Sequence, residues 1–204
     1  MWRSSSKEKC VEILLEADAN PNAADDANST PLHWAAARGV LNIVVRLSDK
    51  GADPNVSTKT GVRPIHKASI YGQFQIVKKL VECGADPDNR QHGCGGTPLH
   101  HTLAGGYVEL VEFLLDARAD VNAANRYGVH PLHIAVKREY TDCIACLMSH
   151  ELPLDKVKEE LGWAVQYDLG DAVRCLLSNG SAARAERARA LLAAPLTALR
   201  RLST

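Results

Sequence analysis

A short pattern recurs along the chain at nearly constant spacing, and this recurrence constrains the fold more than any other feature. Each copy places a proline before Leu or Ile and a histidine. The four prolines are separated by 33, 34 and 33 residues: Pro31, Pro64, Pro98 and Pro131. One leucine per unit recurs in the same way, at steps of 33, 33, 34 and 33: Leu14, Leu47, Leu80, Leu114 and Leu147. Two independent markers that share the one-residue offset predict an array of repeats in which each unit packs on its neighbours.

The residues within each unit predict a helix, a turn, a second helix and a loop. Thr30 and Thr97 are good N-caps, and each proline follows at the first helical position, where the missing N–H costs nothing. In the second helix, apolar residues recur at intervals of three and four and form one buried stripe, as in 41–47, 75–81 and 108–115.

Glycine is expected at the left-handed positions that close these helices. The first helices end at Gly39, Gly72 and Gly106, and the second helices at Gly51, Gly84 and Gly180. In the remaining units, residues other than glycine close the second helix: Asp18, Arg118 and Glu151. The left-handed conformation of each costs about 1 kcal/mol of stability. We therefore expect an array of moderate stability whose terminal units are the least stable.

The 33-residue unit and its Thr-Pro-Leu-His core resemble the ankyrin repeat. The resemblance implies an all-α solenoid of stacked helix-turn-helix units joined by β-hairpin-like loops. We expect an ankyrin-repeat domain at 1–180 and a basic Ala/Arg-rich tail at 181–204. The domain divides into a half repeat at 7–22, repeats at about 30–55, 63–88, 97–122 and 130–155, and a degenerate repeat with a shortened loop at 160–180.

The half repeat is expected to expose the apolar stripe of Val11, Leu14 and their neighbours, because only residues 1–6 precede its single helix. Three explanations stay open. The helix frays, something covers it, or the sequence is a truncated product of a longer gene.

Composition narrows the function. The chain has 24 basic residues (Lys and Arg) and 24 acidic residues (Asp and Glu), which gives a formal net charge of +0. This balance argues against a generic nucleic-acid or membrane-surface binder. The six scattered cysteines predict reduced thiols, and the N-terminus lacks a secretory signal. We expect a cytoplasmic protein, with the nucleus as the alternative, that acts as a monomer. The sequence has no recognised catalytic motif, so we predict a non-enzymatic protein without catalytic residues, metal or cofactor.

Three motifs could suggest chemistry, but each is better explained by the repeat. His33, His66, His100 and His133 recur at the period of the fold and can reach back to the helix cap. Cys143 and Cys146 have redox or zinc spacing, yet they replace core positions of the preceding unit. The run 93–96 is Gly-rich without a phosphate-loop lysine, so we interpret it as a flexible loop tip.

The resemblance implies that a partner protein is bound by the loop tips and the exposed side of the first helices. Carried onto this chain, the predicted contacts are Arg38, Lys59, Thr60, Val62, Ile70, Tyr71, Arg126, Tyr127, Val129, Lys137 and Arg138. Tyr71 and Tyr127 are the candidate energetic anchors, and the basic residues favour a partner with an acidic surface. Trp34 shares one helical position with Lys67, His101 and Ile134, and it either joins this surface or fills the core.

Two further hypotheses come from the resemblance. Residues 114–122 are similar to the motif of an asparaginyl hydroxylase that recognises ankyrin repeats, which would modify Asn122 unless this side chain only braces the turn. Residues 196–202 faintly resemble the box that docks substrate receptors onto cullin ubiquitin ligases, although Arg200 replaces its usual cysteine. The alternatives to a simple binding module are therefore a substrate-recruiting ligase subunit or a fragment of a larger scaffold.

Overall fold

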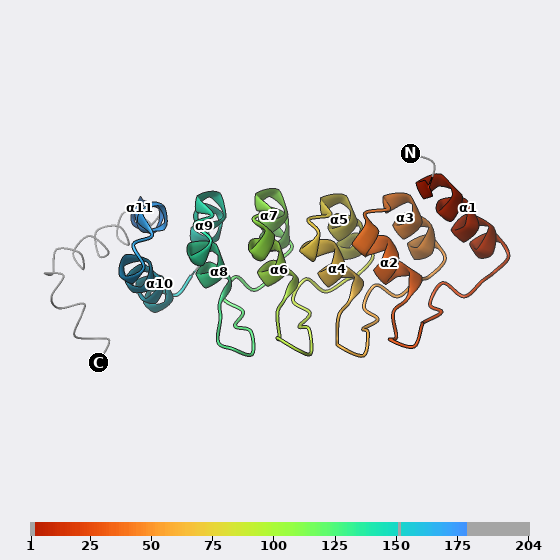
Figure 1. The fold of residues 1–204 in the computed structure, drawn as a ribbon, viewed down its shortest axis with the longest axis horizontal. Coiled ribbons are helices and arrows are strands. Elements are labelled where there is room, and N and C mark those ends of the chain that lie inside the picture. The colour runs from red at the N-terminus through yellow and green to blue at the C-terminus, as the bar shows by residue number, and fades with distance from the viewer. Residues whose placement is uncertain (1–2, 151, 179–204) are drawn as a thin grey trace, which may run out of the picture.

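The chain forms an elongated stack of short helices in two layers (Figure 1). The structure, a computed structural model, describes residues 3–150 and 152–178. This part contains α-helices and no strands. The helices are α1 (Arg3–Glu16), α2 (Pro31–Arg38), α3 (Leu41–Asp49), α4 (Pro64–Ile70), α5 (Phe74–Glu82), α6 (Pro98–Gly105), α7 (Val108–Asp116), α8 (Pro131–Lys137), α9 (Thr141–Met148), α10 (Leu154–Gln166) and α11 (Gly170–Ser178). The predicted all-α solenoid of helix pairs is confirmed.

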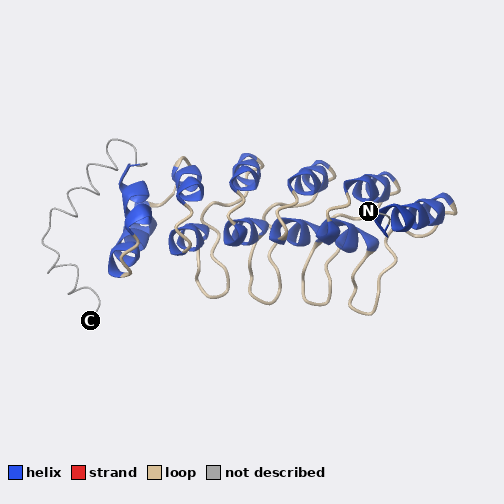
Figure 2. Cartoon of the chain, turned by 45° about the horizontal axis from the view of Figure 1, so that its top comes forward, coloured by secondary structure: helices blue, strands red, loops and turns tan. Residues whose placement is uncertain are grey.

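The first helices α2, α4, α6 and α8 lie in one layer, and their partners α3, α5, α7 and α9 lie in the other (Figure 2). Long loops project from the side of the first helices (Figure 1). We call these loops fingers 1 to 4, with tips at residues 25–29, 58–62, 91–96 and 125–129. The finger face is the surface formed by the four fingers and the adjoining sides of the first helices.

The core lies between the two layers and is made of the apolar stripes that repeat along the chain. Leu47, Leu80, Leu114 and Leu147 are all buried, as their repeating positions predict. At α1 the equivalent Leu14 is 57% exposed, whereas Leu15 is buried against the core. Ile13 is also exposed and Val11 is partly buried. The predicted apolar stripe is therefore open at Leu14, because the main packing of α1 is against α3 on one side.

Each finger tip is a tight turn closed by its own backbone. In finger 4, the N–H of Asn125 donates to the carbonyl of Val129 at 2.9 Å, and Gly128 adopts a left-handed φ of 72°. Finger 1 uses Asn28 at the same position, with φ of 60°. Finger 3 carries one extra residue, so its Gly95 N–H reaches back four residues to Gln91. The predicted β-hairpin-like loops are thus turns joined by backbone hydrogen bonds, without assigned strands.

The last helix pair departs from the spacing of the others. Its first helix, α10, begins at Leu154, six residues before the position 160 expected from the sequence. The connection from α9 is short and has no finger, and α10 runs for 13 residues. Val157, Leu161 and Ala164 are buried at helical spacing, which explains why the helix continues through this segment.

Left-handed residues close the helices where expected. Asp18 and Arg118 have φ values of 55° and 65°, and Gly51 and Gly84 share this region. Glu151 and Gly180 lie outside the described residues, as do the basic tail at 181–204 and the ligase-like segment at 196–202.

Candidate functional site

Large apolar side chains are exposed on the finger face instead of being packed inside. Trp34 on α2 is 54% exposed, which resolves its position in favour of the surface. Tyr71 directly follows α4 and is 55% exposed, while Tyr127 at the tip of finger 4 is 76% exposed. Ile70, at the end of α4, is exposed as well. Such side chains are common anchors at protein interfaces.

Most predicted contact residues are accessible on this face. The exposed polar members are Arg38, Lys59, Thr60, Arg126, Lys137 and Arg138. Val129 is partly buried. The structure therefore brings a mixed basic and aromatic set together along the fingers and the ends of the first helices.

Val62 is placed differently from its prediction as a contact residue. Its side chain is only 8% exposed, and its carbonyl accepts a hydrogen bond from Nε2 of His33 at 3.0 Å. Gly96 is also buried, and an added Cβ would lie 3.3 Å from Nε2 of His101. Both residues belong to the packed framework of their fingers, so Val62 has little side-chain surface to offer a partner.

Backbone hydrogen bonds join neighbouring fingers, so the finger face is formed without a bound partner. The N–H of Lys59 in finger 2 donates to the carbonyl of Ala27 in finger 1 at 2.9 Å. The N–H of Arg126 in finger 4 donates to the carbonyl of Cys94 in finger 3 at 3.0 Å. Gly61 has φ of 73°, and a Cβ there would meet the His92 backbone nitrogen at 2.5 Å. Fingers 2 and 3 are therefore also in close contact.

The repeated histidines serve the framework in three units. Nδ1 of His33 accepts the backbone N–H of Thr30 at 3.1 Å, and the corresponding bonds in later units are made by His66 and His100. Because Nδ1 is an acceptor, the ring proton is on Nε2, which donates to the next unit. His33 and His100 bond to finger carbonyls 29 residues further along the chain.

His66 makes the same two kinds of hydrogen bond, but its Nε2 donates to a different acceptor. Its Nε2 lies 2.8 Å from the carbonyl of Asn89, 23 residues away, and Gly96 at the tip of finger 3 is a second backbone contact of the ring. Burial lowers its pKa to about 4, since the charged ring would lose its solvation. Burial likewise lowers the pKa of His33 and of His100, so these rings stay neutral and structural.

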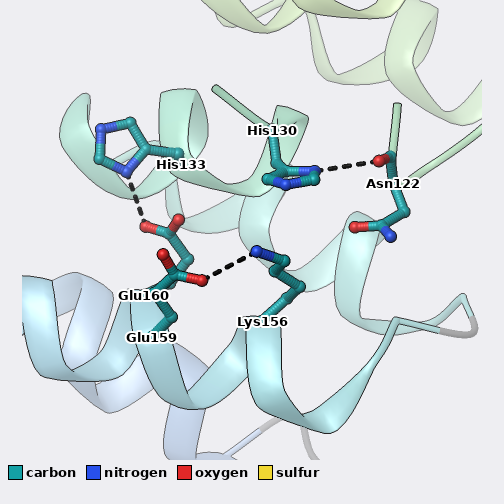
Figure 3. A network of polar contacts seen from close by, with 6 residues as sticks. All are labelled: Asn122, His130, His133, Lys156, Glu159 and Glu160. Carbon is teal, nitrogen blue, oxygen red and sulfur yellow. Dashed lines mark hydrogen bonds and ion pairs between the residues drawn. The ribbon is translucent and has the colours of Figure 1, made fainter. Parts of the chain in front are cut away.

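The fourth histidine is used differently. Nδ1 of His133 lies 2.9 Å from Oε2 of Glu160 on α10, so it does not accept a cap N–H as predicted (Figure 3). Its ring also packs edge-on against Trp163, with centroids 4.8 Å apart. Burial raises the pKa of Glu160, while the adjacent His133 opposes that shift. Sequence reasoning missed Glu160 because the contact depends on how α10 covers α8.

Within the described residues, the side-chain oxygen of Asn122 makes fewer hydrogen bonds than that of its counterpart Asn55. The Asn55 side chain donates to the Gly84 carbonyl at 2.8 Å and accepts the Asp86 N–H at 3.2 Å. Oδ1 of Asn122 is buried and has no hydrogen-bond partner within the described residues. Pro153 stands where the next unit would have this donor, and proline has no N–H. Hydroxylation of Asn122 stays a prediction.

Cys143 and Cys146 behave as packing residues of α9. All six cysteines are free. Cys143 is buried, and burial raises the pKa of both Cys143 and Cys146 to about 11, so neither favours the reactive thiolate form. Among the residues that the structure describes, no group of three His, Cys, Asp or Glu side chains could hold a metal ion. None of the helices in that same part is long and apolar enough to span a membrane.

The comparisons with known proteins agree with the architecture. The family described as ankyrin repeats (3 copies) matches three overlapping stretches, residues 1–91, 65–160 and 99–186. Rabankyrin-5 of Mus musculus is 32% identical over 94 residues, which cover 44% of this chain and 8% of that protein. Rabankyrin-5 of Homo sapiens is 39% identical over 56 residues, which cover 28% of this chain and 5% of that protein. The chain thus spans less than a tenth of these relatives, and it belongs to the ankyrin-repeat family.

Proposed function

We propose that the chain is a non-enzymatic binding module whose finger face holds a partner protein. Ankyrin repeats are generally protein–protein interaction modules. The observation that carries the proposal is the exposure of Trp34 on α2, Tyr71 at the end of α4 and Tyr127 at the tip of finger 4. Exposed aromatic side chains on a rigid scaffold bind at low entropic cost, because few rotatable bonds must be ordered.

The charges of this face support a partner with an acidic surface. Arg38, Lys59, Lys137 and Arg138 are exposed, and none forms an ion pair with a carboxylate in the described part of the chain. Unpaired cations at the rim of an interface raise association rates and select against basic partners. Acidic residues on the partner would meet these groups without breaking internal ion pairs.

The chemistry of the side chains also supports the remaining parts of the proposal. The free thiols of Cys143 and Cys146 fit a reducing compartment, so the cytoplasm or nucleus is the proposed location. We propose in addition that the chain acts as a monomer. The buried His33, His66 and His100 have framework roles, as their hydrogen bonds to the next unit illustrate. They support a scaffold that binds instead of a catalytic centre.

Affinity capture from cytosol tests the proposal. The intact chain is compared with a Tyr71→Ala, Tyr127→Ala double variant, with captured proteins identified by mass spectrometry after far-UV circular dichroism has confirmed folding. The matched control is Ile13→Ala, Leu14→Ala, which removes two similarly exposed apolar side chains from α1. We expect partners to be lost from the tyrosine variant and kept by the control. The reverse pattern would move the binding site to α1.

The same experiment addresses the two alternative hypotheses. Cullin adaptors among the proteins retained by both variants would favour the ligase hypothesis, which rests on residues 196–202 outside the described part. The hypothesis of a fragment from a larger scaffold is tested by sequencing the transcript for coding sequence that supplies a helix to pack before α1.

A further inference from the structure

A groove of about 580 Å³ opens on the finger face between fingers 1 and 2. Trp34 of α2 and Lys67 of α4 line it from the helices. The finger tips contribute Asp25, Asp26, Ala27, Ser29, Thr58, Lys59, Thr60 and Val62. Its volume falls within the range of sites that enclose a few side chains of a bound molecule.

Both walls of the groove are held in place by hydrogen bonds. The backbone bond from Lys59 to Ala27 joins the two finger tips at 2.9 Å. Nδ2 of Asn28 donates to the carbonyl of Ser57 at 2.6 Å, and the hydroxyl groups of Thr58 and Thr60 lie 3.0 Å apart. A ligand would therefore meet a formed groove and would not have to order the fingers first.

Trp34 makes this groove different from the equivalent places in the other units. The same helical position holds Lys67, His101 and Ile134, which are all partly buried, whereas Trp34 is 54% exposed. An indole in this setting offers a broad apolar surface to a bulky side chain.

The charged groups around Trp34 are not equally available. Oδ1 of Asp25 already accepts the N–H groups of Ala27 at 2.9 Å and Ser29 at 2.8 Å, so this carboxylate holds the finger turn. Lys59 and Lys67 have no carboxylate within ion-pair distance in the part of the chain that the structure describes. The groove therefore offers a ligand an aromatic surface beside two unpaired ammonium groups, and the negative charges of the exposed Asp26 and of the turn-bound Asp25 oppose them.

We infer that this groove binds an extended segment of the partner in which a bulky apolar side chain is followed or preceded by Asp or Glu. The apolar side chain packs on Trp34, and the neighbouring carboxylate pairs with Lys59 and Lys67. The inference rests on the proposed binding function of the finger face and names the kind of segment that this part of the face recognises.

Selection from a phage-displayed library of random 12-residue peptides against the full chain tests the inference. We expect enriched peptides to carry Phe, Tyr, Trp, Leu, Ile or Met next to Asp or Glu. A labelled synthetic copy of the most enriched peptide is then titrated by fluorescence anisotropy. Binding should weaken at least tenfold in Trp34→Ala and in Lys59→Glu, Lys67→Glu, and it should also weaken as salt is added.

A charge-matched control is Lys78→Glu, Lys158→Glu, which alters two exposed lysines away from the groove and should leave the affinity unchanged. All variants are first compared by thermal unfolding. Enrichment of basic or uncharged peptides, an affinity that survives Trp34→Ala, or no enrichment at all would each overturn the inference. If Tyr71→Ala, Tyr127→Ala abolishes partner capture while Trp34→Ala does not, the proposed function stands and only this groove assignment fails.

Discussion

Lowering the pH from 7 to 5 is expected to destabilise the array, and His66 carries a share that can be calculated. Its pKa is about 4 in the folded chain against 6.5 as the ordinary value. Between these values the unfolded chain binds a proton that the folded chain does not, so stability is full above pH 6.5 and is lost as the pH falls toward 4. Linkage gives a loss of about 2 kcal/mol at pH 5 for this single residue.

The physical reason lies in the contacts of the ring. Nδ1 of His66 accepts the Arg63 N–H at 3.1 Å, so a second ring proton has no acceptor there. The His101 ring lies 5.8 Å away and also has its pKa lowered by burial to about 4, so a charge on one ring disfavours a charge on the other. The raised pKa of Glu160 acts in the opposite direction at the last helix pair. A difference between two proteins is therefore more informative than one pH profile.

The assay is urea unfolding followed by far-UV circular dichroism at pH 7 and pH 5, for the natural chain and for His66→Gln. Glutamine keeps an amide donor but does not titrate. Because the contacts of the histidine ring are lost, we expect the His66→Gln variant to be less stable at both pH values. We expect its loss between pH 7 and pH 5 to be smaller than that of the natural chain by about 2 kcal/mol. Equal losses in the two proteins would refute the conclusion that His66 is the group held neutral by folding.

Three further comparisons use residues at equivalent positions. Leu80→Ala should cost about 2–5 kcal/mol in urea unfolding, while Leu14→Ala should cost under about 1 kcal/mol because its side chain is already exposed. Asn55→Ala should cost about 1–3 kcal/mol and Asn122→Ala less, since Oδ1 of Asn122 makes no hydrogen bond within the described residues; equal costs would contradict the difference in bracing. Arg118→Gly should stabilise the chain by about 0.5–1 kcal/mol because φ is 65°, and an unchanged or lower Tm would contradict strain at this residue.

The repeated framework could be predicted from sequence because it obeys local rules. Pro31 and Thr30 specify a helix start, and the leucine at Leu80 lies on a stripe whose period reveals burial. These features need only residues close in the chain and the knowledge that identical units stack. The helix pairs, the left-handed closing residues and the capping role of the first three histidines follow from them.

The details that escaped prediction depend on contacts between units of unequal length. Glu160 meets His133 because α10 starts early, and the buried Val62 presents its carbonyl to His33 of the preceding unit. Trp34 was ambiguous, since an indole at that helical position fits either a core or a surface. The groove around Trp34 is formed by the tips of fingers 1 and 2 together, and the sequence does not give the arrangement of these tips in space.

Hydrogen bonds between units span a constant number of residues, and this spacing limits how a gene for such a chain can change in length. His33 and Asn55 each bond to a carbonyl 29 residues further on. Duplicating or deleting one whole unit brings an equivalent carbonyl to the same place, so every junction is restored. A single inserted residue does not restore this spacing, and beside the longer finger 3 the hydrogen bond of His66 goes to Asn89, 23 residues away, with Gly96 as a second backbone contact of the ring. Evolution of this array by complete units is therefore the route that leaves its junctions intact.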